Sequence, residues 1–339
     1  IDSADAYCDR ALDIFEKNRK GNLSEQDGLY KGIVRRLPEA YLLKSRIIAK
    51  SGDDSLPIAL AELEKAMNYL QEERRNFESD GSQLVFIDNH SEIYGQAAQW
   101  AYDLFKREQD VEYKEDILRY AEERKTVLLK RRLNKFSSLR VANIPDSIIS
   151  KEEVLLSKLS DPEAKAEYAQ AEEDYDALLD LIRSEYPAYY NLRYDSKTAS
   201  LEDIQQDLLG PNQIFVEYID TGERLLAVVI SPKKAEVIEL PSLTDQKAIE
   251  RLNAAILAGD HKRIQQFSSE LYRGIFAPLL PFIEQLELLI VPDGDLYALN
   301  FETLLTEQGN FLIENHTISY LLSATTALLY RDLEKNEKH

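Results

Sequence analysis

Two carboxylates that lie close together in the sequence are the residues best placed to do chemistry. Asp293 and Asp295 flank Gly294 directly after a predicted buried strand at residues 286–291. A pair of carboxylates on one loop could bind a cation or a basic side chain. The same residues also suit an ordinary turn that ends a strand, in which Asp opens the turn and Gly supplies a positive φ. We favour the turn and keep Asp293 and Asp295 as candidates for a functional loop.

Nucleophiles and bases are scarce in this sequence. It contains one cysteine, Cys8, and four scattered histidines, at positions 90, 261, 316 and 339. We expect Cys8 to pack in the core of a helical segment, because a nucleophilic cysteine needs a base within hydrogen-bond reach and the sequence indicates none. We expect His90 to cap a helix or lie at the surface, His261 to lie in a turn and His316 to precede a strand. We therefore assign no catalytic, cofactor-binding or metal-binding residue and predict no cofactor.

The short motifs that usually reveal an enzyme are missing as well. The sequence contains neither of the glycine-rich phosphate-binding patterns, and it contains no zinc-peptidase or serine-hydrolase signature. A single cysteine excludes a disulfide framework within the chain and any multi-cysteine zinc or iron–sulfur site.

The charge balance argues against two classes of partner. Lys and Arg number 41 against 61 Asp and Glu, for a net charge of −20, whereas nucleic acids and anionic membranes attract an excess of positive charge. No apolar run approaches the roughly 18–20 residues of a membrane span, and no basic-then-apolar leader occurs. We predict a cytoplasmic protein that binds neither nucleic acid nor membrane.

Charge is also unevenly distributed along the chain. Residues 1–150 contain 24 basic and 27 acidic side chains, whereas residues 151–339 contain 17 and 34. The acidic stretch at residues 161–185 reads as a solvated helix face or as a docking surface for a basic partner. A basic cluster carries no acid, and it comprises Arg124, Lys125, Lys130, Arg131, Arg132, Lys135 and Arg140. This cluster could complement a helix dipole, bind nucleic acid or contact the acidic stretch, and we favour the first.

The first part of the chain reads as helix after helix. Apolar residues recur at helical spacing, and the helices are separated by breaks at residues 21–22, 37–38, 51–54, 79–81 and 144–146. Ala59 and Ala66 lie seven residues apart with Leu63 between them, a spacing that lets paired helices approach closely. The pattern resembles a degenerate array of tetratricopeptide repeats, which run roughly 34 residues each.

Near residue 200 the periodicity changes to that of an α/β sheet. Three short β-branched and aromatic runs, at residues 214–219, 225–230 and 235–240, predict an antiparallel meander. A helical pair at residues 245–276 and the strand at 286–291 follow, and a strand at 317–321 then leads into a helix from Ser323. Strands that alternate with helices predict an α/β sheet, whose ligands normally bind at the carboxyl ends of the strands.

The order of several blocks across residues 170–330 resembles the CHAT domain, the caspase-like module of bacterial tetratricopeptide–CHAT proteins. The blocks include Ile214-Phe215-Val216-Glu217-Tyr218, Ile275-Phe276-Ala277-Pro278-Leu279-Leu280, Leu289-Ile290-Val291-Pro292-Asp293-Gly294-Asp295-Leu296, Phe301-Glu302-Thr303-Leu304-Leu305 and Ile318-Ser319-Tyr320-Leu321-Leu322-Ser323-Ala324. Residues 120–133 and 144–147 resemble the bridge that such proteins place between the array and the CHAT domain.

The resemblance implies a cysteine peptidase related to caspases and separases, in which a helical array senses a partner. In that family the catalytic histidine and cysteine follow later strands, and neither position is present in this sequence. The chain also begins with Ile1 and contains only Met67. We therefore expect a piece of a longer protein, inactive as a peptidase by itself.

Together these observations predict an α plus α/β chain. A degenerate tetratricopeptide-like array at residues 1–145 is followed by an acidic helical bridge at 146–190 and the first half of a CHAT sheet at 191–339. We predict the regulatory and recognition part of a cysteine peptidase, with a protein or peptide partner bound by the array. The alternative is a non-enzymatic interaction scaffold with an inert CHAT fold. In either case an open sheet edge favours self-association.

Overall fold

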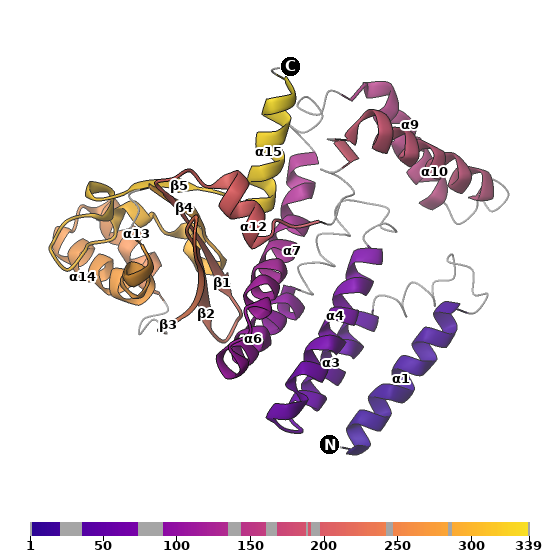
Figure 1. Ribbon diagram of the computed structural model, residues 1–339, viewed down its shortest axis with the longest axis horizontal. Coiled ribbons are helices and arrows are strands. Elements are labelled where there is room, and N and C mark those ends of the chain that lie inside the picture. Colours follow the sequence, from indigo (N-terminus) through magenta and orange to yellow (C-terminus); the bar gives the residue numbers. More distant parts are fainter. Residues whose placement is uncertain are drawn as a thin grey trace. The chain divides into compact units, whose positions relative to one another are not determined.

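The computed structural model describes residues 2–20, 36–73, 91–134, 144–160, 168–187, 189–190, 197–241, 247–283 and 287–337. Its amino-terminal part is helical, as predicted (Figure 1). The helices of this part are α1 (Asp2–Lys20), α3 (Leu37–Ala49), α4 (Leu56–Glu73), α6 (Ser91–Glu108), α7 (Glu112–Asn134), α9 (Asp146–Ser160) and α10 (Tyr168–Glu185), with a 3-10 turn at Asp53–Ser55.

Contacts divide the chain into two compact units. One unit contains residues 1–100, 126–197 and 329–339, and the other contains residues 101–125 and 198–328. Helices α6 and α7 each contribute to both units, so the first half of α7 belongs with the sheet. The three-part division at residues 145 and 190 stays a prediction, because the units are not continuous in sequence.

Small residues let α3 and α4 pack closely within the helical unit. Ala59, Leu63 and Ala66 on α4 are fully buried, as their spacing suggests. Pro38 stands in the first turn of α3, where it needs no hydrogen-bond partner for a backbone N–H, so this break in the sequence is a helix start. Gly52, with a φ of +138°, lies in the turn between the two helices.

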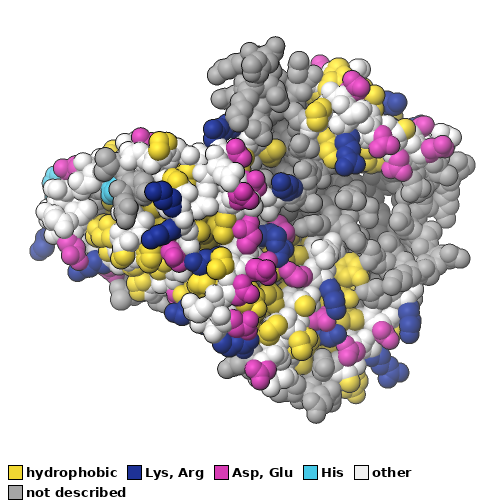
Figure 2. All heavy atoms as spheres, viewed as in Figure 1, with side chains coloured by type: hydrophobic (Ala, Val, Ile, Leu, Met, Phe, Trp, Pro, Cys, Tyr) yellow, Lys and Arg dark blue, Asp and Glu magenta, His cyan; other side chains and the backbone are white. Residues whose placement is uncertain are grey.

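Helices α9 and α10 form a second helical hairpin with a core of its own. The core contains Ile144, Leu155, Ala171, Leu178, Ile182 and Tyr189. The Tyr189 hydroxyl donates a hydrogen bond to buried Glu152, with an oxygen–oxygen distance of 2.8 Å. Acidic side chains on α10 face solvent (Figure 2), among them Glu173, Asp174, Asp176, Asp180 and Glu185. Much of the acidic stretch is therefore a solvated helix face.

The carboxyl-terminal part contains a mixed five-stranded sheet of order β3-β2-β1-β4-β5. Its strands are β1 (Gln213–Asp220), β2 (Leu225–Ile230), β3 (Ala235–Leu240), β4 (Glu287–Val291) and β5 (Thr317–Tyr320). The first three form the predicted antiparallel meander, whereas β4 pairs parallel with both β1 and β5. Helical array and sheet together confirm the predicted α plus α/β class.

Short capping signals mark the helices α12 (Leu201–Asp203), α13 (Ala248–Ala258) and α14 (His261–Leu271) of the sheet unit, and a π turn at Ile204–Leu208 follows α12. Helix α15 (Ala324–Glu337) begins in this unit, and its residues from 329 onward belong to the helical unit. A π turn at Tyr272–Phe276 and 3-10 turns at Ala277–Phe282, Gly294–Ala298, Phe301–Thr303 and Leu312–Glu314 complete the unit. Gly259 ends α13 in the left-handed conformation, and the Asp260 side chain caps α14 by accepting from the Arg263 N–H.

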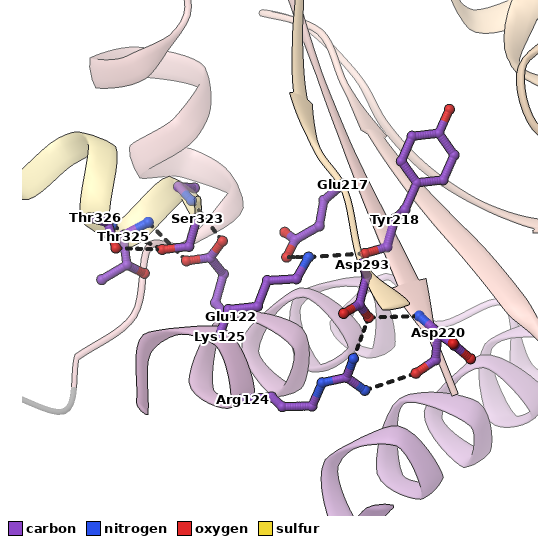
Figure 3. Close-up of polar contacts among 11 residues, drawn as sticks. Glu122, Arg124, Lys125, Glu217, Tyr218, Asp220, Asp293, Ser323, Thr325 and Thr326 are labelled. Carbon is purple, nitrogen blue, oxygen red and sulfur yellow. Dashed lines mark hydrogen bonds and ion pairs between the residues drawn. The ribbon is translucent and has the colours of Figure 1, made fainter. Parts of the chain in front are cut away.

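Strand β1 presents different residues to its two sides. Ile214, Val216 and Tyr218 join the main core, which includes residues of α13 and α14. Glu217 points the other way because successive side chains alternate along a strand, and it meets Lys125 of α7 (Figure 3). The central strand is thus apolar toward α13 and α14 and carries one buried acid toward α7.

Candidate functional site

The two predicted carboxylates have different surroundings. Asp293 is only 5% exposed, whereas Asp295 is exposed in the 3-10 turn that follows β4. Asp293 forms an ion pair with Arg124 and accepts a hydrogen bond from the Asp220 N–H at 2.8 Å. Of the two ligands considered from sequence, Asp293 thus binds a basic side chain. Gly294 between them has a φ of +54°, as the turn interpretation requires.

Lys125 of α7 is buried against the end of strand β1. Its ammonium nitrogen lies 2.9 Å from Glu217 Oε1 and donates to the Tyr218 carbonyl oxygen at 3.0 Å. Figure 3 shows the pair, and both side chains are almost completely buried, at 3% and 0% exposure. A buried charge is tolerated only when it is paired and hydrogen-bonded, so this contact fixes α7 to β1.

Arg124, the preceding residue, connects the ends of two neighbouring strands. Its guanidinium donates to the Asp220 carbonyl oxygen at 2.8 Å and also binds the Asp293 carboxylate (Figure 3). Asp220 ends β1, and Asp293 follows β4 by two residues. One side chain of α7 therefore holds together the carboxyl ends of two parallel strands.

Glu122 lies one helical turn before Lys125 on α7, and its carboxylate caps helix α15. Its two carboxylate oxygens accept hydrogen bonds from the backbone N–H groups of Ala324 and Thr325, at 2.7 and 2.8 Å. Ser323 Oγ accepts from the Thr326 N–H at 3.1 Å. The first N–H groups of a helix lack partners within the helix and carry partial positive charge, so a buried carboxylate stabilises them.

Burial sets the proton affinities of the central pair. Withdrawal from water raises the pKa of Glu217 to about 8, against the opposing effect of the Lys125 ammonium. Burial by itself would lower the pKa of Lys125, but the charges of Glu217 and Asp293 outweigh it and hold that pKa above its ordinary value. Lys125 is therefore a cation at neutral pH, and Glu217 binds its proton far more tightly than an exposed glutamate.

The cluster formed by Glu122, Arg124, Lys125, Glu217 and Asp293 supports structure, because its members bind one another and backbone groups of β1 and α15. Elsewhere, Cys8 is buried on α1, exposed His261 opens α14, and His316 packs edge-on against the Phe276 ring at 5.9 Å. His90 and His339 lie outside the described residues. Among the residues whose placement is described, no group of His, Cys, Asp and Glu could hold a metal ion.

Two residues of this buried cluster were already named in the sequence analysis, because they belong to a run of basic residues. Arg124 and Lys125 belong to the predicted basic cluster, but their partners are acids of the sheet unit and not the acidic stretch on α10, so that alternative is wrong for these two residues. The other five residues of the basic cluster have no described side-chain position; they are Lys130, Arg131, Arg132, Lys135 and Arg140. Glu217 was not singled out from the sequence. An acid between apolar residues of a strand does signal a buried cation nearby, because a charge in a medium of low dielectric constant needs a partner.

A separate open pocket lies on the helical unit, between α1, α3 and α4. It has a volume of about 870 Å³ and is lined by residues that include the stacked pair Tyr41 and Tyr69. Lys44 bridges two acids there, at 2.8 Å from Asp9 and 3.5 Å from Glu62.

Comparison with known families finds a match to the CHAT domain over residues 265–339. The matched segment runs from within α14 through β4 and β5 to α15, and it contains Asp293 and the capped start of α15. A comparison with curated proteins found no match. No described helix is long and apolar enough to cross a membrane. The CHAT part of the predicted resemblance is thereby supported, in a caspase-like peptidase-family context.

Proposed function

We propose that this chain is the regulatory and recognition part of a caspase-like cysteine peptidase, whose catalytic histidine and cysteine lie outside these 339 residues. The observation that carries the proposal is the CHAT match at residues 265–339. This match falls on two parallel strands and the helix that follows them, the part of an α/β sheet that positions groups at strand ends.

The chemistry of such a peptidase is attack of a thiolate on a peptide carbonyl, with a histidine as base. The chain's own contribution is a rigid sheet, fixed at the carboxyl ends of β1 and β4 by Arg124 and Lys125. A further strand could pair with β5, where Thr317, Ser319 and Tyr320 are exposed. When residues 1–339 are present without a further strand, the exposed edge of β5 also supports self-association.

The helical unit supplies the recognition surface in this proposal. The pocket between α1, α3 and α4 offers the stacked rings of Tyr41 and Tyr69 and the charges of Asp9, Lys44 and Glu62 to a protein or peptide partner. The tetratricopeptide resemblance and the pocket both support this placement. The alternative is a non-enzymatic interaction scaffold in which the CHAT fold is inert.

The sequence of the parent gene distinguishes the two functions. The peptidase proposal requires a reading frame that continues into a His-Gly element and a later strand that ends in cysteine. A frame that continues with neither element would favour the inert scaffold. A stop codon directly after residue 339 would contradict the peptidase proposal.

A further inference from the structure

The buried cluster contains more negative than positive groups. Its carboxylates are Glu122, Glu217 and Asp293, and its cations are Arg124 and Lys125. If every group were ionised, one negative charge would lack a counter-charge in a region withdrawn from water. Such a charge is costly, and a carboxyl group can avoid the cost by keeping its proton.

The hydrogen bonds indicate which carboxylate holds the proton. Both oxygens of Glu122 accept backbone N–H groups, and Asp293 Oδ2 accepts from Arg124 and from the Asp220 N–H. Glu217 uses only Oε1, which binds Lys125. Its second oxygen, Oε2, is buried and has no hydrogen-bond partner among the described residues. The extra proton therefore fits best on Glu217.

We infer that this cluster is a proton-controlled latch, in which protonated Glu217 balances the buried charges while the first half of α7 is held on β1, and loss of the proton loosens that contact. The inference goes beyond the proposed function and does not depend on it. All its residues belong to the sheet unit.

The groups that face Glu217 come from each element around it. Helix α7 presents Lys125 and Glu122, with Arg124 adjacent, and the turn after β4 presents Asp293 and the Tyr297 hydroxyl. The two neighbouring strands place apolar residues opposite, Val228 on β2 and Val291 on β4. Lys125 keeps its charge as pH rises, so Glu217 is the group that changes charge near neutrality.

The direction of the pH effect follows from the raised pKa of Glu217. With α7 in place, burial raises the pKa of Glu217 to about 8, and detachment of α7 would expose the carboxyl to water and return its pKa toward the ordinary value of 4.5. Between these values the latched form binds one more proton than the open form. The latch is therefore tightest at the acidic end of this interval, weakens as pH rises through it, and changes no further above about pH 8.

Hydrogen exchange of the α7 amides at residues 112–125, corrected for intrinsic rates, tests the latch in the full chain. The opening constant should rise by up to about tenfold per pH unit between about pH 5 and about pH 8. Glu217→Gln, which mimics the protonated form, should abolish that rise. Glu236→Gln is the matched control, because it removes another contact between α7 and the sheet, with Lys114, and should keep the rise.

A wild-type opening constant that does not change with pH would overturn the latch, and so would a Glu217→Gln chain with the wild-type dependence. If Glu217→Gln fails to fold, carbon NMR of the Glu217 carboxyl in the wild-type chain decides instead. A resonance typical of an un-ionised carboxyl at about pH 7 supports the latch. A resonance typical of a carboxylate there contradicts it.

Discussion

Lys125 lies among acids that have little access to water, and it is the charge on which the cluster depends most. Removing one partner of a buried ion pair leaves the other charge uncompensated, and this costs more than the loss of an exposed pair. The pairing of Lys125 with Glu217 is completely enclosed, whereas that of Lys114 with Glu236 leaves Glu236 38% exposed. The two lysines, both on α7, therefore provide a matched comparison.

Lys125→Met should lower the free energy of unfolding of the sheet unit by about 3–5 kcal/mol, because the buried Asp293 carboxylate loses a counter-charge and the Glu217 carboxyl loses its hydrogen-bond partner. Lys114→Met should cost about 1 kcal/mol or less. Urea denaturation, monitored by an optical signal from the sheet unit, measures the free energy of unfolding of both variants. Equal losses for the two variants would show that burial of the Lys125 pair is not decisive.

Gly294 is the other residue on which the cluster depends. Its φ of +54° is unfavourable for other residues, and an added Cβ would meet the carboxylate of Asp220. Gly294→Ala should destabilise the unit by more than about 1 kcal/mol and should weaken the contact of Arg124 with the strand ends. Gly222→Ala controls for the backbone strain, because Gly222 has a φ of +86° with open space around it. A loss no larger than that of the control would contradict the steric argument.

At the scale of elements, helix α15 depends on a cap from a distant helix. Glu122 is 202 residues from Ala324 in the sequence, yet it accepts the N–H groups that open α15. Most caps come from the residue just before the helix. A distant cap couples the start of α15 to the position of α7.

Glu122→Gln should therefore speed hydrogen exchange at the Ala324 and Thr325 amides and cost about 1–3 kcal/mol, since a charged acceptor of two N–H groups is weakened. Amides in β2 should change little. Glu112→Gln, at an exposed position in the first turn of the same helix, serves as the control. Unchanged exchange at both amides of α15 would refute the cap.

The elements themselves could be predicted from local pattern. The strands at 214–219, 225–230 and 235–240 follow from β-branched runs and turn residues, and Gly259 with Asp260 marks the turn between α13 and α14. The cluster could not be predicted, because Lys125 and Glu217 lie 92 residues apart and no local pattern pairs them. Only Glu217, an acid between Val216 and Tyr218 in the middle of β1, indicated that a cation was needed. Asp293 was kept only as a candidate that could bind a cation or a basic side chain, and the structure pairs it with Arg124.

At the scale of the whole molecule, one unit is helical and contains a pocket, and the other contains the sheet and most of the CHAT match at residues 265–339. The net charge of −20 lies mostly after residue 150, where α10 carries part of it in solvent. The central claim is that these residues regulate and scaffold a peptidase without supplying its catalytic pair.

A peptidase assay against a mixed peptide library tests this claim most directly. The product of the complete parent gene and the chain of residues 1–339 should be compared at equal concentration. We predict that the parent product cleaves peptides, that substitution of its strand-terminal cysteine by alanine abolishes cleavage, and that residues 1–339 alone cleave none. Cleavage by residues 1–339 alone, or a parent product that cleaves no peptide, would contradict this claim.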